Sequence, residues 1–374
     1  MDLTLAGRRA DTSPPPERPV LRGLPPEAYT SEDYFRREQE RVFARNWAFV
    51  GFAHELKEPG TAIPVQAAGQ PLLLLSDEQG RLGVFHNVCR HRGLQLVMER
   101  CTVEQSLVCP YHAWSYSLDG ALESSPHFGG MRIQEAPGFK RCDFGLQKVR
   151  FHIWNDWIFV NVDGQAPDFE SCSATLRATL AELEYGGLEP IGKIDLGEVR
   201  ANWKLLMENF IEPYHVPIVH NRTAAGQPLR DHYTIARGLC NGSGVDLEVP
   251  KQDQVVADNL DMSARYLTLF PNFVLGVYLP DQSGVHLNVP VSAGLTRQYR
   301  VLYAINGRQY SQEERRKLCE LWFSVHKEDH AIVERLQLGR ASSVMGDGGL
   351  LSPVWEDSVH SFQQLVAGAM AAQS

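Results

Sequence analysis

Two short segments of the chain each carry one cysteine and one histidine. Cys89 and His91 are two residues apart in "NVCRHRG", and Cys109 and His112 are three apart in "CPYHAWSY". Each segment is short enough to form one tight loop. Thiolates and imidazoles paired in this way fit either a closed tetrahedral zinc site or a [2Fe–2S] cluster in which two histidines replace two cysteines.

The distribution of these four residues over the loops favours iron. A zinc finger usually takes its cysteines from one segment and its histidines from another, whereas here each loop offers one of each. Both irons of a Rieske [2Fe–2S] cluster can then draw one ligand from each loop. Pro110, Tyr111 and Trp114 beside the second pair would limit the access of water to the sulfurs, which influences the reduction potential. We predict the cluster, with zinc as the alternative.

A second group of metal-binding residues lies in "NWKLLMENFIEPYHVPIVH". His215 and His220 are five residues apart with Pro217 between them. Because proline disrupts a helix interior, the two imidazoles need not follow helical spacing and can face one metal. A carboxylate would complete the two-histidine, one-carboxylate triad of Fe(II) oxygenases, which leaves positions on the metal open for O2.

Helical periodicity identifies a carboxylate for this triad. The apolar residues between 311 and 339 recur at helical spacing, and Asp329 lies in the middle of the apolar stripe. Burial of an unpaired carboxylate is costly, so a metal or a basic partner must compensate it. We predict that Asp329 is the third ligand, with a structural ion pair as the alternative. His326 is expected in the core or beside the site, and Lys327 and Glu328 are expected to be solvated charges.

The elements that position these residues follow from the patterns of apolar residues. Ser31 is a plausible N-cap for a helix that ends near Trp47. From 48 to 160, short apolar runs are broken by Gly, Pro, Asp and Asn, as in a small β domain. Further helices are expected near 172–185, 202–215, 311–340 and 355–370, and strands near 265–305.

These patterns predict an α+β protein with three regions. An N-terminal tail with a helix that packs on the catalytic domain is expected at 1–44. A Rieske [2Fe–2S] domain is expected at 45–158, and a catalytic domain with a mononuclear iron at 159–374.

Composition and charge limit the partners and the location. The net charge of −9 and the lack of a basic run with interleaved aromatics exclude a nucleic-acid surface. The sequence contains no apolar stretch of the roughly 20 residues that a membrane span needs, and no signal peptide is recognised at its start. Seven cysteines in 374 residues suit a reducing compartment without disulfides. We expect a cytoplasmic protein that acts on a small molecule.

The two loops resemble the signature loops of the Rieske non-heme iron oxygenases, the catalytic alpha subunits of ring-hydroxylating and demethylating systems. The resemblance continues upstream through "YFRREQERVFARNWAFVGFAHEL" and downstream to the C-terminus; Ala113 stands where the family often has Gly. It implies a small antiparallel β Rieske domain and an α+β catalytic domain whose antiparallel sheet is covered by helices, of the helix-grip type. It also implies a Rieske cluster, a mononuclear Fe(II) and O2 as cosubstrate.

The resemblance further implies a homotrimer in which Glu212 bridges an iron-ligand histidine and a Rieske histidine of the neighbouring subunit. The family usually has Asp at this place, and Glu is similar to the branch that acts on quaternary ammonium compounds. Pro213 and Val216 stand where that branch commonly has Cys. Asn209 is expected either beside the iron site or as a structural amide.

The expected reaction needs electrons from another protein. The chain shows no GxGxxG after a strand and no flavin or plant-type ferredoxin cysteine set, so NAD(P)H must be oxidised by a separate reductase, with or without a ferredoxin. We expect hydroxylation or oxidative N-dealkylation of a quaternary or N-methyl ammonium compound. The alternatives are a mono- or dioxygenase that hydroxylates the ring of an aromatic acid, and a non-enzymatic Rieske electron carrier, which would not need the iron triad.

Aromatic residues in "RYLTLFPNFVLGVYLP" are candidates for the substrate pocket. Phe270, Phe273 and Tyr278 could line the cavity or pack in the core. In a cavity they would offer cation–π contacts to an ammonium group or stacking to an aromatic ring.

Overall fold

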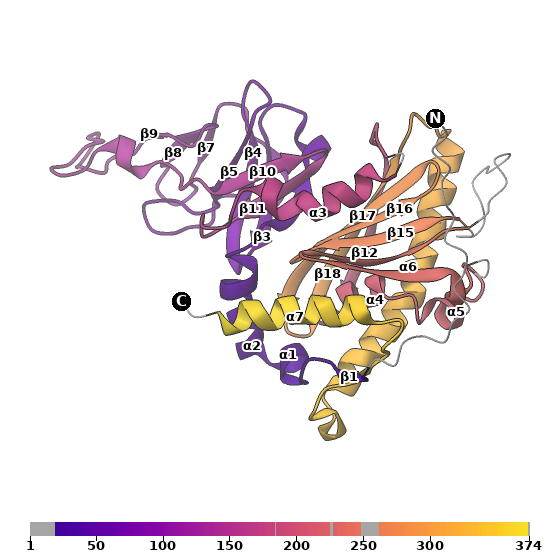
Figure 1. Cartoon of the computed structure of the whole chain (residues 1–374). Coiled ribbons are helices and arrows are strands. Elements are labelled where there is room, and N and C mark those ends of the chain that lie inside the picture. The colour runs from indigo at the N-terminus through magenta and orange to yellow at the C-terminus, as the bar shows by residue number, and fades with distance from the viewer. Residues whose placement is uncertain (1–18, 184, 225–226, 248–261, 373–374) are drawn as a thin grey trace. The chain divides into compact units, whose positions relative to one another are not determined.

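A computed structural model describes residues 19–183, 185–224, 227–247 and 262–372 (Figure 1). It divides into two compact units. One is formed by Arg36–Ser171, and the other combines the residues up to Phe35 with those from Cys172 on. The proline-rich residues 1–18 of the expected tail lie outside the described part of the chain. The predicted limits at 44 and 158 stay predictions.

The Arg36–Ser171 unit consists mainly of short antiparallel strands (Figure 1). One sheet has the order β5-β4-β3-β6, a second β7-β8-β9 and a third β10-β11-β2. The strands are β2 (Ala48–Phe52), β3 (Thr61–Ala67), β4 (Gln70–Ser76), β5 (Leu82–His86), β6 (Cys101–Thr102), β7 (Ser106–Val108), β8 (Ser115–Ser117), β9 (Leu122–Ser124), β10 (Arg150–Trp154) and β11 (Trp157–Asn161). This is the small β domain that the broken apolar runs predicted.

The core of this unit reaches the two Cys/His loops. Cys89 and Cys109 are buried in one apolar cluster with Leu73 and Phe85 from the β5-β4-β3-β6 sheet and with Trp114. The loops are therefore anchored on a packed core through their cysteines.

The second unit is built on a seven-stranded antiparallel sheet with the order β12-β18-β17-β16-β15-β14-β13. Its strands are β12 (Glu189–Val199), β13 (His232–Arg237), β14 (Cys240–Val245), β15 (Ala264–Leu269), β16 (Phe273–Tyr278), β17 (Gln282–Ser292) and β18 (Leu295–Ala304). A separate short antiparallel pair is formed by β1 (Leu21–Arg22) and β19 (Leu350–Leu351).

The helices of the chain are α1 (Glu27–Thr30), α2 (Glu32–Glu38), α3 (Phe169–Ala181), α4 (Trp203–Ile211), α5 (Val216–Val219), α6 (Gln312–Arg340) and α7 (Asp357–Ala371). Short 3-10 or π turns lie at Gln39–Phe43, Ala53–Leu56, Arg141–Phe144, Leu229–Asp231 and Ser343–Met345. None of the helices in the described ranges has the length and hydropathy needed to cross a bilayer.

Local signals explain where the main helices begin and end. The Ser311 side chain accepts from the N–H of Glu314, whose carboxylate accepts from the N–H of Ser311, a capping box that starts α6. Asn202 caps α4 by accepting from the N–H of Lys204 at 3.0 Å. The α4 helix ends at Ile211, short of the predicted 215, because Pro213 cannot continue it and the residue before a proline favours extended backbone.

One face of the sheet carries α4 and α6. Residues directly opposite one another on neighbouring strands point to the same face, and Val274, His286 and Arg300 are such partners on β16, β17 and β18. From this face His286 contacts Phe210 of α4, with ring centroids 4.8 Å apart. Tyr278 contacts Trp322 of α6 at 4.5 Å. The antiparallel sheet covered by helices confirms the predicted α+β class and its helix-grip arrangement.

Candidate metal centres

The two Cys/His loops have the same backbone structure. The N–H of Cys89 donates to the carbonyl of Leu94 and the N–H of Cys109 to the carbonyl of Trp114, both at 2.8 Å. The carbonyl of each cysteine in turn accepts from the N–H four residues on, at 3.0 Å. Each loop is thus closed on its own cysteine by backbone hydrogen bonds.

The residue four positions after each cysteine turns the loop back. Gly93 has φ 79° and Ala113 has φ 57°, so both lie in the left-handed region. The left-handed conformation costs an alanine about 1–2 kcal/mol, whereas glycine adopts it without this cost because it has no Cβ. The matching hydrogen bonds show that the loop with Ala113 closes in the same way as the loop with Gly93.

The side chains of the four predicted cluster ligands lie together. Cys89 and Cys109 are each 2% exposed, whereas His91 is half-buried and His112 is exposed, with the two imidazole centroids 4.6 Å apart. Trp114 stacks on His91 at 4.9 Å. The cysteine pair therefore faces the core and the histidine pair faces outward, which suits a cluster with one iron on each pair.

These distances also argue against a single ion. Neighbouring ligand atoms of a tetrahedral zinc lie less than about 4 Å apart. Within the described ranges, the set of three or more His, Cys, Asp or Glu residues whose ligand atoms all lie within 4.8 Å of one another is His215, His220 and Asp329, not the Cys/His quartet. A two-iron cluster has no such requirement, so the spread of the quartet is compatible with the predicted [2Fe–2S] cluster.

Tyr116 is a further residue at the cluster site that the sequence reasoning did not identify. Its buried hydroxyl accepts from the N–H of Arg90 at 2.9 Å and lies 3.3 Å from Sγ of Cys89. A hydroxyl that donates to a ligand sulfur stabilises negative charge there and raises a cluster's potential. The sequence signal that could have identified this residue is a tyrosine seven positions after Cys109, the cysteine of the second loop.

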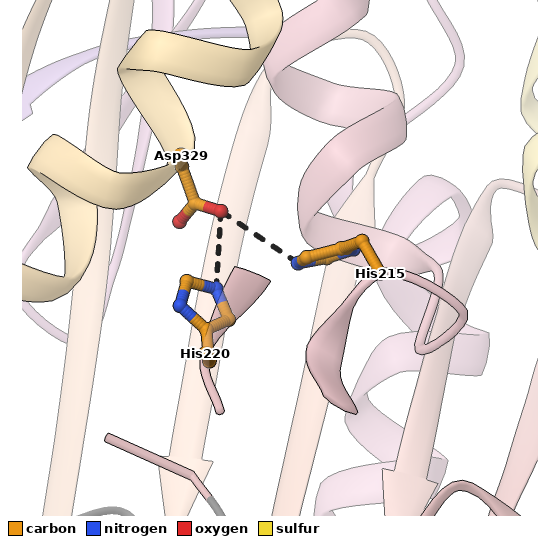
Figure 2. Close-up of side chains that lie close together, drawn as sticks. All are labelled: His215, His220 and Asp329. Carbon is orange, nitrogen blue, oxygen red and sulfur yellow. Dashed lines mark ion pairs between the residues drawn. The ribbon is translucent and has the colours of Figure 1, made fainter. Parts of the chain in front are cut away.

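The second set of predicted ligands comes together around the short α5 helix. His215 precedes it and His220 follows it, so the two imidazoles leave opposite ends of a single turn. Asp329 of α6 completes the set: its Oδ1 lies 3.1 Å from Nε2 of His220 and 3.6 Å from Nε2 of His215 (Figure 2). Two imidazoles and a carboxylate converging in this way form the donor set of non-heme Fe(II) sites.

The electrostatics of this set favour a cation. Burial disfavours the charged form of His220, but its hydrogen bond to Asp329 and the nearby carboxylates raise its pKa to about 9. Burial alone would raise the pKa of Asp329, yet the hydrogen bond and charge of His220 lower it. The neighbouring carboxylates thus stabilise positive charge at both imidazoles. A divalent cation at this place displaces protons from the imidazoles and takes over their role.

Two glutamates hold the outer nitrogens of these imidazoles. Oε1 of Glu212 lies 2.6 Å from Nδ1 of His215, and Oε2 of Glu328 lies 2.8 Å from Nδ1 of His220. Carboxylates in this position fix the ring and leave Nε2 for a metal. Glu212 thus lies where the sequence prediction put it, beside the histidine.

The expectation for Glu328 was wrong. It is not a solvated charge, because its side chain is 19% exposed and also accepts from the hydroxyl of Thr223 at 3.0 Å. The helical stripe of α6 shows only which residues face the sheet. It does not show that the segment around α5 covers the neighbouring side of the helix.

Asn209 lies beside the set, and its amide donates to Oδ1 of Asp329 at 3.3 Å. His326, expected in the core or beside the site, is buried one turn before Asp329. These placements leave the structural and positioning roles of both residues as predictions.

A cavity adjoins the three clustered residues. It is lined by His215, His220 and Asp329 and, among others, by Tyr266, Tyr278 and Arg300. Phe270 and Phe273 are not among the described residues that line it; both are buried, in agreement with the core packing given as the alternative for them. Phe270 lies in the turn after β15, and Phe273 is an odd number of positions from Tyr278, so its side chain points to the opposite face of β16.

Comparisons with known proteins match both units of the chain. The family model "Ring hydroxylating alpha subunit (catalytic domain)" matches residues 180–372, and the model "Rieske [2Fe-2S] domain" matches residues 46–136. The first match spans the mononuclear triad, and the second spans both Cys/His loops.

Several curated proteins are similar to this chain. The glycine betaine monooxygenase oxygenase subunit of Chromohalobacter salexigens is 33% identical over 59% of this chain and 48% of its own length, so the match spans about half of that relative. The carnitine monooxygenase oxygenase subunit of Escherichia coli is 25% identical over 92% of both chains. The large oxygenase component of salicylate 5-hydroxylase from a Ralstonia species is 31% identical over 52% of this chain and 48% of that relative.

A solved structure shows the same fold. A quaternary ammonium Rieske monooxygenase in complex with L-carnitine aligns with a TM-score of 0.77 over 94% of this chain and 96% of that one. Its sequence is 24% identical, so the likeness concerns the architecture.

Proposed function

Since the chain belongs to the ring-hydroxylating alpha subunit family and carries a Rieske domain, we propose that it is the terminal oxygenase of a multicomponent system. Electrons from NAD(P)H reach it through a separate reductase, with or without a ferredoxin. In a monooxygenase turnover, one atom of O2 enters a C–H bond of the substrate and the other becomes water, with two electrons and two protons consumed.

The convergence of His215, His220 and Asp329 beside a cavity carries this proposal. These three residues would hold Fe(II), which when bound supplies positions for O2. Glu212 and Glu328 keep Nε2 of both imidazoles directed at the metal, because each carboxylate binds the Nδ1 on the other side of its ring. Asn209 restrains the Asp329 carboxylate through its amide. A pure electron carrier would have no use for this arrangement.

The proposed cluster ligands have a different role from that of the triad. Cys89, His91, Cys109 and His112 would hold a Rieske cluster, which supplies one electron at a time. We propose that three chains form a ring in which Glu212 connects His215 of one chain to a Rieske histidine of the next. This role of Glu212 is supported by its direct contact with His215. A carboxylate bound to that imidazole can connect the iron site to a further group.

The proposed substrates are quaternary or N-methyl ammonium compounds, which the enzyme would hydroxylate or N-dealkylate. Glu212 and the similarity to the glycine betaine and carnitine monooxygenase subunits support this class. The salicylate 5-hydroxylase component, at 31% identity, supports aromatic acids as a second class.

Metal analysis and an Asp329→Ala variant test the proposed function. The purified protein should contain three irons and two acid-labile sulfides per chain and show a Rieske EPR signal. Asp329→Ala should keep the sulfide and the signal, lose one iron, and abolish substrate-stimulated O2 uptake. Glu320→Ala, an exposed acid on the same helix, is the matched control and should behave as the unmodified chain. Loss of the cluster in Asp329→Ala would contradict the proposed separation of tasks.

A further inference from the structure

Arg300 is a buried cation in the wall of the cavity. It lies on β18, is 0% exposed and belongs to the lining of the same cavity as the iron triad. Its Nη1 lies 2.7 Å from Nε2 of His326, and its Nη2 donates to the hydroxyl of Tyr278 at 3.0 Å. Its guanidinium lies over Trp322, 3.7 Å from the ring centroid. These contacts are all with neutral groups.

No acidic side chain balances this charge directly. Arg300 takes part in none of the ion pairs found among the described residues, and its Nε is buried without a hydrogen-bond partner. Asp329 shares the cavity, but its carboxylate is engaged by His215, His220 and Asn209. An arginine stays protonated in proteins, and a buried charge is stable only when it is paired. The charge of Asp329 across the cavity favours the charged form of Arg300, but no carboxylate among the described residues contacts the guanidinium.

The surroundings hold the guanidinium in this place. Gly284 lies on the neighbouring strand β17, and a Cβ there would lie 2.6 Å from both Nε and Nη2 of Arg300. The glycine thus leaves the space that the guanidinium occupies. His326 can accept from Arg300 because burial and the charges of nearby groups keep the pKa of this imidazole well below its usual value.

The position of Arg300 also restricts where a cationic group can bind. Aromatic rings are the usual acceptors of an ammonium group; Phe210, Tyr266, Tyr278 and Trp322 line the cavity, and of these Tyr278 and Trp322 face Arg300. The guanidinium already lies 3.7 Å from the centroid of Trp322 and 5.5 Å from that of Tyr278. A second cation on these faces would be repelled, whereas a carboxylate would be attracted in this buried setting.

We propose that Arg300 binds the carboxylate of the substrate, so that the enzyme acts on organic acids and not on purely cationic amines. The carboxylate binds the guanidinium, and the carbon or N-methyl group to be oxidised lies toward the iron triad. This inference rests on the proposed function and narrows its substrates to compounds with a carboxylate, either zwitterionic betaines or aromatic acids.

Matched pairs of compounds test this inference on the iron-loaded enzyme. Glycine betaine is compared with choline, benzoate with benzamide, and salicylate with salicylamide. Calorimetric titration reports binding, and O2 uptake with the reduced enzyme reports turnover. We expect at least one acid to bind and its carboxylate-free counterpart to bind about 30-fold more weakly or not at all.

Variants assign the effect to Arg300. Arg300→Gln should weaken binding of the acid by about 30-fold or more and leave binding of the neutral amides, benzamide and salicylamide, unchanged. Gly284→Ala should displace the guanidinium without removing its charge and produce an intermediate loss. If Arg300→Gln fails to fold, the Gly284→Ala variant still tests whether the acid binds at Arg300. Arg297→Gln, on the same strand and paired with Asp195 at 2.8 Å, is the matched control and should bind the acid normally. Iron content and the Rieske EPR signal verify that each variant is intact.

The outcomes separate this inference from the proposed function. Binding of an acid that depends on Arg300, without any turnover, would support the carboxylate site and count against the oxygenase. Turnover of choline with no binding of any acid would support the oxygenase and overturn the carboxylate site. If no acid binds at all, or if Arg300→Gln binds the acid as tightly as the unmodified chain, the inference is wrong.

Discussion

The two metal-binding regions are built in different ways. The Cys/His loops close on themselves through backbone hydrogen bonds between residues four or five positions apart. The iron triad joins α5 to α6, and the contact between His220 and Glu328 spans 108 positions in the chain. One region depends on local backbone geometry and the other on the packing of helices against a sheet. Damage to one should therefore leave the other intact.

The regions also differ in how they hold their imidazoles. His91 stacks on Trp114 and lies toward the surface of its unit, whereas His215 and His220 are each bound by a glutamate through Nδ1. A stacked histidine keeps its ring nitrogens available to a neighbouring molecule. A carboxylate-bound histidine is more basic and binds a metal more firmly. This contrast suits electron transfer at the first region and retention of iron at the second.

The largest effect is expected from a variant that damages the cluster region and leaves the iron triad intact. Cys109→Ser should abolish the cluster, because the buried thiolate pair is essential to one of its irons, while the triad still binds one iron. Sulfide analysis and EPR would show the loss, and a titration with Fe(II) would show the retained site. Cys319→Ser, a partly buried cysteine of the other unit, is the control. Loss of the triad's iron in Cys109→Ser would break the independence of the regions.

A second variant addresses the link between them. Glu212→Gln removes the negative charge that binds His215 and, in our proposal, connects to the neighbouring cluster. We expect turnover to fall by about 100-fold. In rapid-mixing experiments the reduced cluster should be reoxidised by O2 and substrate at a correspondingly lower rate. A normal reoxidation rate with weakened iron binding would show that Glu212 only positions His215.

The corresponding glutamate of His220 provides a comparison. Glu328→Gln should weaken Fe(II) binding by about 10-fold without slowing electron transfer once iron is saturating, because this residue has no proposed contact with the cluster. Iron titration followed by rapid mixing at high iron would test it. Equal defects in Glu328→Gln and Glu212→Gln at saturating iron would contradict a special task for Glu212.

The smallest effect concerns the matching loops. Ala113→Gly should relieve the left-handed strain of the alanine, an effect of about 1–2 kcal/mol that the greater freedom of glycine in the unfolded chain reduces. We expect a gain in stability of up to about 1 kcal/mol, measured by denaturation with the cluster signal as reporter. Gly93→Ala in the first loop should produce the opposite change. Destabilisation by Ala113→Gly would show that the two loops are not equivalent.

Local sequence patterns predicted much of this molecule. The ligand loops could be recognised because Cys and His lie a few residues apart, where chain geometry alone keeps them together. The extent of α6 followed from the helical spacing of its apolar residues between 311 and 339. Asp329 could be found because a carboxylate in an apolar stripe contradicts ordinary helix patterning. All of these signals act over at most a few turns of chain.

Only the tertiary structure decided which distant side chains share a space. It covered Glu328 with the segment around α5 and put Arg300 into the cavity wall beside Trp322. The periodicity of apolar residues indicates which side of a helix or strand is buried. It does not indicate which element covers that side, because the covering element depends on sheet register and on how helices pack. The residue types of the candidate metal ligands could therefore be recognised locally, whereas the convergence of α5 with α6 and the chemistry of the cavity arose from the packing of segments far apart in the chain.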